Sequence, residues 1–159
     1  MAFSGEAQSL VWQRAEIALR NASPGAQAAM RALKTWLAAH KLALSTLQFV
    51  AFDRTTNGTD GSNADTVICS AACTLYYLYG KKFTTATLSY LKISNHASAI
   101  QAQGEIILAS TTASIELQYI SYQGFAFATG ATLASVTAYN GTTHNALAAS
   151  HDGFAVIGA

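Results

Sequence analysis

The chain has 159 residues, a formal net charge of +1 and only 11% charged residues. This length suits one compact domain, and the balanced charge argues against general electrostatic binding of nucleic acid. No apolar stretch reaches the roughly 18 residues that a membrane-spanning helix needs. Because an average soluble domain carries about 25% charged residues, so sparse a charge favours a surface that is covered by neighbours in an assembly.

The charge is divided unevenly along the chain. Residues 1–44 carry an excess of three positive charges, and residues 45–159 carry an excess of two negative charges. Ordinary solvated helix faces account for such an excess, and a basic arm that docks on an acidic partner is the alternative. The composition also changes near residue 44, which separates an N-terminal helical segment, residues 1–44, from a β domain, residues 45–159.

The N-terminal segment predicts two helices. Ser4 is a suitable N-cap for the first, in which apolar residues recur at helical spacing up to residue 18. Ser23 followed by Pro24 is a start signal for the second, which extends to about residue 40. Neither helix can bury its apolar stripe alone, so each must pack on the β domain or on another subunit. The stripe residues expected at contacts between subunits are Leu10, Val11, Ile17, Met30, Leu33, Trp36 and Leu37.

The β domain alternates short apolar runs with turn residues. Strands are expected at 46–52, 66–79, 84–94, 105–109, 114–122, 125–129, 132–139 and 154–157. Lys81-Lys82 and Gln123-Gly124 are expected to be turns, and residues 53–65, 95–104 and 142–152 are expected to be loops. Short strands at this spacing indicate a mainly β fold, an antiparallel β-sandwich of jelly-roll type. The last strand must be paired within the sheet or given to a neighbour, because an open apolar edge promotes aggregation.

The two cysteines, Cys69 and Cys73, fall within a run that is expected to be one strand. In an extended strand their Cα atoms would be about 13 Å apart, which is too far for a disulfide. They are therefore predicted to be buried free thiols. The first six residues lack the basic and apolar regions of a signal peptide, which favours synthesis and assembly in a reducing cytoplasm.

The histidines and the cysteines form no recognisable catalytic motif. His40, His96, His144 and His151 lack metal-ligand spacing, and His144 and His151, which fall in one polar loop, are expected to be exposed there. A dyad or metal site where His144 and His151 share a loop with Asp152 is the alternative. Cys69 has no neighbouring His or Asn that would activate a thiolate. No enzymatic activity and no cofactor are predicted.

One polar loop offers oxygen ligands for a hard cation such as calcium. The spacing of these residues departs from that of an EF-hand loop, and the same residue types dominate ordinary turns. A calcium site there stays an open alternative. The residues are Asn57, Asp60, Asn63 and Asp65.

Aromatic residues gather on three of the expected strands. Alternate members of each strand face the core, and the outward members favour a subunit interface, where aromatic residues are enriched. Stacking on sugar rings is the alternative use. The aromatic residues are Tyr76, Tyr77, Tyr79, Tyr119, Tyr122, Phe125 and Phe127. Tyr77, Tyr79 and Phe154 complete the set of interface candidates.

Three apolar segments closed by glycines resemble those of head decoration, or cement, proteins of tailed phages. They are residues 74–80 (TLYYLYG), 124–130 (GFAFATG) and 152–159 (DGFAVIGA), and the likeness covers roughly residues 66–159. The resemblance implies a rigid β-sandwich that bridges neighbouring capsomers and needs no active site. The helical first 44 residues are not part of the resemblance.

This resemblance implies a non-enzymatic virion structural protein that stabilises the head shell. Its expected partners are other copies of itself, with a trimer suited to the local threefold points of the lattice, and the major capsid protein of a phage head. Neither nucleic acid nor a membrane is an expected partner. The expected location is the capsid surface, with assembly in the host cytoplasm. The alternatives are a neck, tail or fibre component and a carbohydrate-binding jelly-roll module.

Overall fold

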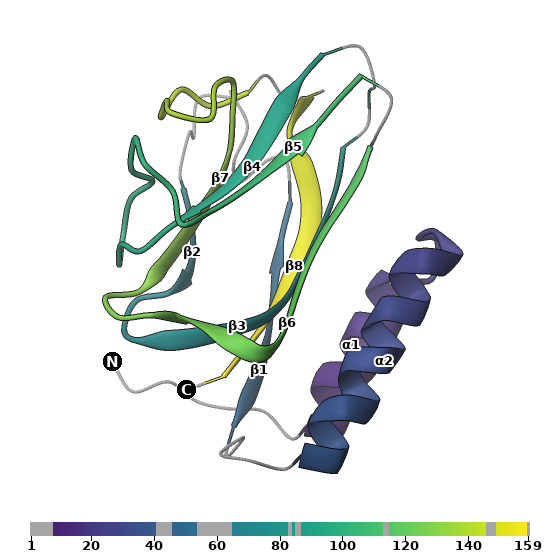
Figure 1. Cartoon of the computed structure of the whole chain (residues 1–159). Helices are drawn as coiled ribbons and strands as arrows, with labels where there is room; N and C mark the ends of the chain where they lie inside the picture. Colours follow the sequence, from purple (N-terminus) through teal and green to yellow (C-terminus); the bar gives the residue numbers. More distant parts are fainter. Residues whose placement is uncertain are drawn as a thin grey trace.

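The computed structural model describes residues 8–40, 46–53, 65–82, 84, 87–112, 115–145 and 149–158. Two helices, α1 (Gln8–Ala18) and α2 (Pro24–His40), precede the strands. The strands form two antiparallel four-stranded sheets that face one another (Figure 1). This architecture confirms the prediction of an antiparallel β-sandwich preceded by a two-helix segment.

The two sheets have different strand orders, and the helices cover the outer face of one of them. Sheet A has the order β1 (Leu47–Phe52), β8 (His151–Gly158), β3 (Cys73–Lys82) and β6 (Glu116–Phe127). Sheet B has the order β2 (Thr66–Cys69), β7 (Ala131–Val136), β4 (Ser89–Ser94) and β5 (Ile106–Ser110). Both helices lie against the outer face of sheet A, so the molecule has three layers (Figure 1).

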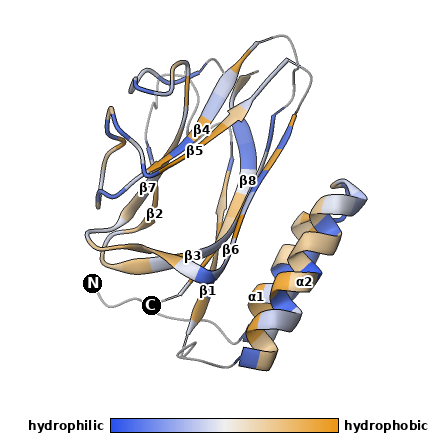
Figure 2. Cartoon of the chain, viewed as in Figure 1, coloured by the Kyte–Doolittle hydropathy of each residue, from blue (hydrophilic) through white to orange (hydrophobic). Residues whose placement is uncertain are grey.

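Two apolar cores follow from the period-two alternation of the sheet A strands, because successive side chains point to opposite faces. One set, with Leu78, Ala155 and Ile157, fills the space between the sheets. The opposite set, with Tyr77, Tyr79 and Phe154, packs against the buried stripes of α1 and α2. Figure 2 shows hydrophobic residues on both sheets, and a mixture of hydrophobic and hydrophilic residues along the helices.

The expected strand 66–79 is two strands, and the prediction of free thiols is wrong. The chain bends at residues 70–72, so Cys69 ends β2 in sheet B and Cys73 begins β3 in sheet A. The bend brings the two Cα atoms to 6.6 Å, and the cysteines form a disulfide. The estimate of about 13 Å failed because it assumed an extended chain.

The two expected turns at Lys81-Lys82 and Gln123-Gly124 are also wrong. Both lysines are the last residues of β3, and β6 is one long strand that contains Gln123 and Gly124. The register with β3 shifts at this point, which is a bulge rather than a turn. Gly124 has a φ of +83°, and a Cβ there would lie 2.2 Å from Thr74 Cγ2. Glycine therefore permits the bulge without ending the strand.

The C-terminal strand β8 lies inside sheet A, between β1 and β3. It pairs with residues on both sides over most of its length, and its residues 154–158 are fully buried or nearly so. It is therefore paired within the chain rather than given to a neighbour. β8 begins at residue 151, three residues earlier than expected, while β4 begins later and β7 ends earlier than expected.

Candidate functional site

Most of the predicted interface residues lie inside the chain. Seven of them form the core between the helices and sheet A, where they are buried by other residues of the same chain. The list is Val11, Met30, Leu33, Leu37, Tyr77, Tyr79 and Phe154. Trp36 is half-buried at the margin of this core. These side chains attach the helices to sheet A, and as packed here they are not accessible to another subunit.

Only Leu10 and Ile17 of the predicted set are exposed. Their side chains keep 43% and 61% of their accessible surface. They are seven residues apart on α1, so they lie on the same face of the helix, two turns apart. Arg14 lies between them and is also exposed. The outward face of α1 is thus an apolar pair with a basic group between its members.

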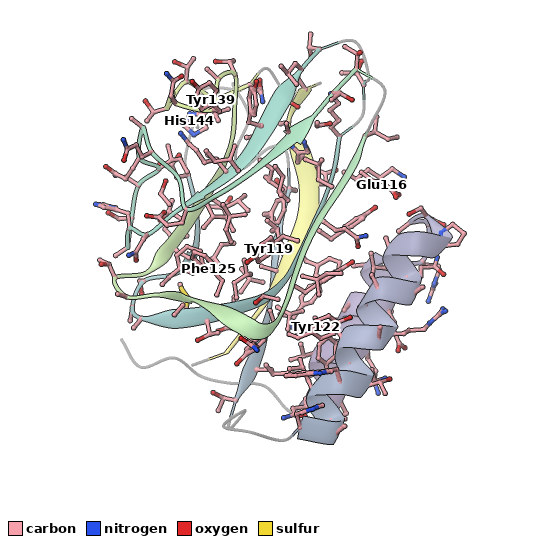
Figure 3. The ribbon with its side chains drawn as sticks, in the orientation of Figure 1. Glu116, Tyr119, Tyr122, Phe125, Tyr139 and His144 are labelled. Atoms are coloured by element: carbon pink, nitrogen blue, oxygen red, sulfur yellow. A yellow bond between two sulfur atoms is a disulfide. The ribbon has the colours of Figure 1, made fainter. Side chains whose placement is uncertain are left out.

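The start of α2 is attached to sheet A by a carboxylate. Glu116, the first residue of β6, accepts hydrogen bonds from the backbone N–H of Ser23 at 3.1 and 3.2 Å. Ser23 Oγ in turn accepts from Ala26 N at 3.3 Å, as an N-cap residue does. A negative charge at a helix N-terminus is also favourable to the helix dipole. Figure 3 shows Glu116 beside the beginning of α2.

Two further groups hold the Glu116 carboxylate. The Tyr79 hydroxyl donates to Glu116 Oε1 at 3.0 Å, and Lys81 Nζ lies 3.9 Å from the same oxygen. Burial alone would raise the pKa of Glu116, but the hydrogen bonds from Ser23 and Tyr79 and the charge of Lys81 outweigh it and lower the pKa. For Tyr79, burial first and then Glu116 raise the pKa of the hydroxyl. Glu116 is therefore an ionised structural latch near neutral pH.

The turn between the helices is fixed by Gln27. Its side-chain amide donates to the carbonyl oxygens of Leu19 and Ala22, both at 3.1 Å. These hydrogen bonds add a donor to two carbonyls of the turn, and the carbonyl of Leu19 also accepts from the backbone N–H of Ala22 at 2.9 Å. The latch at Glu116 and the turn at Gln27 together make the helix pair a rigid layer.

A charged row crosses the end of sheet A, next to this turn. Lys81 in β3 lies opposite Asp152 in β8 and opposite Glu116 in β6. Asp53, Lys81 and Asp152 line a hollow of about 330 Å³ between the sheet and the end of α1, with Tyr79 and Phe154 among its apolar walls. On the helical side, a groove of about 300 Å³ between α1 and α2 is bordered by Arg20 and Arg31.

An aromatic stack covers the other end of α2. The Trp36 ring stacks on that of His40 with centroids 4.0 Å apart, and the Tyr122 ring lies 5.4 Å from that of Trp36. Figure 3 shows Tyr122 on the side of β6 that faces the helices. Tyr122 and His40 are exposed, whereas Tyr119 and Phe125 point between the sheets. Of the β6 aromatics, Tyr122 is therefore the outward-facing one.

Two buried lysines hold loops through hydrogen bonds to backbone carbonyls. Lys82 Nζ donates to the carbonyls of Ser110 and Thr111, each at 3.3 Å, and to that of Thr87 at 2.5 Å. Lys92 Nζ donates to the carbonyls of Ala102 and Tyr139 and makes a further contact with that of Gly141. Burial lowers the pKa of both amines, and for Lys92 the nearby Asp65 opposes that effect.

The histidines of the expected exposed loop are not exposed. His151 is fully buried, and its Nδ1 lies 2.7 Å from Ser135 Oγ, which also accepts from Asn145 Nδ2 at 3.0 Å. His144 is partly buried and pairs through Nε2 with Asp65 Oδ1 at 2.7 Å. His151 lies in β8, a strand rather than a loop, which explains its burial. The two histidines thus have different partners, and the structure does not unite them with Asp152 as a dyad.

The proposed calcium ligands fall mostly outside the described residues. Asn57, Asp60 and Asn63 lie there, and Asp65 is engaged by His144 and by the backbone N–H of Ile100 at 2.6 Å. Within the described ranges, no group of three or more His, Cys, Asp or Glu could hold a metal ion. No helix in the described part of the chain is long and apolar enough to cross a membrane.

The chain matches no family model, no curated protein and no solved structure.

Proposed function

We propose that this chain is a non-enzymatic virion structural protein, a decoration protein that binds a phage head shell as an oligomer and stabilises it. A protein that binds only the assembled shell shifts the equilibrium toward that shell by mass action. Such a role needs a rigid body and a docking surface, with no reacting groups.

The observation that carries this proposal is the helical layer on sheet A. The buried face of this layer packs against sheet A, and its outward face exposes Leu10, Arg14 and Ile17. Arginine is enriched in protein interfaces, and the buried centre of an interface is more apolar than the rest of the surface. We assign this outward face to the contact with the shell.

The test is co-sedimentation of the chain with genome-free head shells that lack it. A deletion of residues 1–44 is unsuitable, because it would expose the core on sheet A. We instead compare the wild-type chain with the double variant Leu10→Glu/Ile17→Glu, which changes only exposed side chains. The matched control is Leu88→Glu, since Leu88 is similarly exposed but lies before β4 in sheet B.

We expect wild type and Leu88→Glu to saturate the shells and the double variant to bind at least about tenfold more weakly, which is about 1.4 kcal/mol. Equal binding by all three would contradict the assignment of the α1 face. No binding by the wild-type chain would contradict the decoration function itself.

One observation favours the carbohydrate-binding alternative. Tyr139 is 58% exposed in the segment after β7, near His144, as Figure 3 shows. An exposed aromatic ring beside polar groups suits stacking on a sugar. This alternative predicts saturable binding of a glycan that the Tyr139→Ala variant loses. It also predicts that the chain sediments with shells only when the shells carry glycans.

A further inference from the structure

The charged side chains of this molecule are concentrated on one side. Apart from Glu105, Asp65 and the two buried lysines, every Asp, Glu, Lys and Arg that the structure describes lies on the helices or in the charged row of sheet A. In a chain with only 11% charged residues, the rest of the described surface is nearly neutral. Among the described residues, this side therefore offers most of the charge that could give an interface electrostatic specificity.

The two signs of charge are separated within this side. The hollow at the end of sheet A has the carboxylates of Asp53 and Asp152 around Lys81, with Glu116 next to them. The groove between the helices has the guanidinium groups of Arg20 and Arg31 at its border. Glu16 also borders this groove, but its carboxylate pairs with Lys34 at 3.2 Å. The groove is therefore basic and the hollow acidic.

Both sites combine this charge with an apolar floor. Leu19 and Met30 lie beneath the arginines, and Phe52 and Phe154 lie beneath the carboxylates. Arginine forms planar, paired hydrogen bonds with carboxylates, and it packs well on apolar surfaces. Each site thus has the composition of one half of an arginine–carboxylate interface.

We propose that a second copy of this chain docks at this side, with the exposed Arg20 and Arg31 side chains at the border of one copy's groove entering the Asp53–Asp152 hollow of the other. The inference deepens the proposed function, because it supplies the oligomer with an interface. The occupant is a second copy because the chain itself carries both complementary sites. The positions of Arg20 and Asp152 on the latched turn and on a central strand fix the spacing of these sites, which reduces the ordering cost of docking.

The test is the solution mass of the full chain, measured by light scattering after size exclusion. One variant, Arg20→Glu/Arg31→Glu, reverses the groove, and a second, Asp53→Arg/Asp152→Arg, reverses the hollow. The control, Gln103→Glu/Thr142→Glu, adds charge to exposed residues of the neutral surface. Circular dichroism and thermal unfolding check that each variant is folded.

We expect the wild-type mass to be at least twice the 16.7 kDa of one chain, and 1 M NaCl to weaken self-association on the order of tenfold or more. Each reversed variant alone should be a monomer, and an equimolar mixture of the two should associate again, because the groove of each variant is complementary to the hollow of the other. The control should keep the wild-type mass. The mixture also serves as a control for misfolding, because a misfolded variant would not associate with the other variant.

Two results would overturn the inference. One is a wild-type chain that stays a monomer at low salt and high concentration, and the other is an oligomer that both reversed variants retain. If the chain still binds head shells in either case, the proposed interface is wrong and the decoration function is retained. Conversely, an oligomer that follows the charge-swap pattern but binds no shell would support this interface and contradict that function.

Discussion

One buried side chain, His151, is expected to make the sandwich sensitive to acid. His151 is fully buried, and its Nε2 has no hydrogen-bond partner among the described residues. Burial, and secondly the charge of Lys82, lower the pKa of His151 to about 4 from its ordinary 6.5. The neutral ring is therefore the form that fits the core, where it pairs with Ser135.

The stability of the fold should fall as the pH drops from about 6.5 to 4. Between these pH values His151 is protonated in the unfolded chain and still neutral in the folded chain, so a falling pH favours unfolding. The full shift corresponds to a loss of about 3 kcal/mol, and none of it is expected above pH 7. Urea unfolding of the wild type at pH 7.5, 5.5 and 4.5 measures this slope.

The variant His151→Gln identifies the residue responsible. It removes the titrating ring, so its stability should be lower at pH 7.5 but nearly constant down to pH 4.5. His40, His96 and His144 remain in the variant and serve as the internal control. A variant with the same slope as the wild type would assign the acid sensitivity to other groups.

At the scale of the secondary-structure elements, the attachment of α2 to sheet A depends on the Glu116 latch. The variant Glu116→Gln keeps the shape of the side chain but loses the charge and one acceptor for Ser23 N–H. We expect a loss of about 1 kcal/mol at pH 7, as for other helix caps. The matched control is Glu16→Gln, whose exposed pair with Lys34 should contribute less than about 0.5 kcal/mol.

The pH dependence of this loss follows from the lowered pKa of Glu116. A carboxylate with a lowered pKa stabilises the fold above the pKa of the unfolded state, and this contribution is lost as the pH falls through the folded pKa. The difference between wild type and Glu116→Gln should therefore be full at pH 7 and shrink below about pH 4.3. Thermal unfolding of both proteins across this range measures it, and a difference that is independent of pH would contradict an ionised latch.

The elements themselves were predictable where the signal was local. Ser23 with Pro24 marked the start of α2, and alternation marked the sandwich, because caps and strand periodicity depend on neighbouring residues. The bend between Cys69 and Cys73 contains no Gly or Pro, so the run looked continuous and the disulfide was missed. The turn predicted at Gly124 is wrong because glycine occurs in turns and in bulges alike, and only the pairing with β3 distinguishes the two.

At the scale of the whole molecule, the sequence showed that charge is unevenly divided along the chain, but it did not show which charged side chains lie together in the fold. The basic excess of the helical segment was visible in Arg20 and Arg31, whereas the acidic hollow unites Asp53, Lys81 and Asp152 from three separate strands or their ends. The contact of Glu116 with Ser23 joins residues 93 positions apart and leaves no local pattern. The apolar stripes of the helices are mostly buried against sheet A rather than exposed to another subunit, and only Leu10 and Ile17 of the predicted interface residues are exposed.

These features together describe a molecule with two unlike sides. The sheet B side carries two loops fastened by Lys92 and has little charge. The helical side carries the exposed apolar pair, the arginines and the charged row. Assembly is therefore expected on the helical side, where α1 should contact the shell.

The most direct test of this claim is hydrogen–deuterium exchange of the wild-type chain, free and bound to head shells, at equal concentration of the chain. The free chain already contains any self-association, so a further change reports the shell alone. We expect slower exchange on binding in peptides from residues 8–40, with no change in the loops on sheet B. Protection confined to residues 95–104 or 137–145 would contradict the account, because it would place the docking surface on the opposite side.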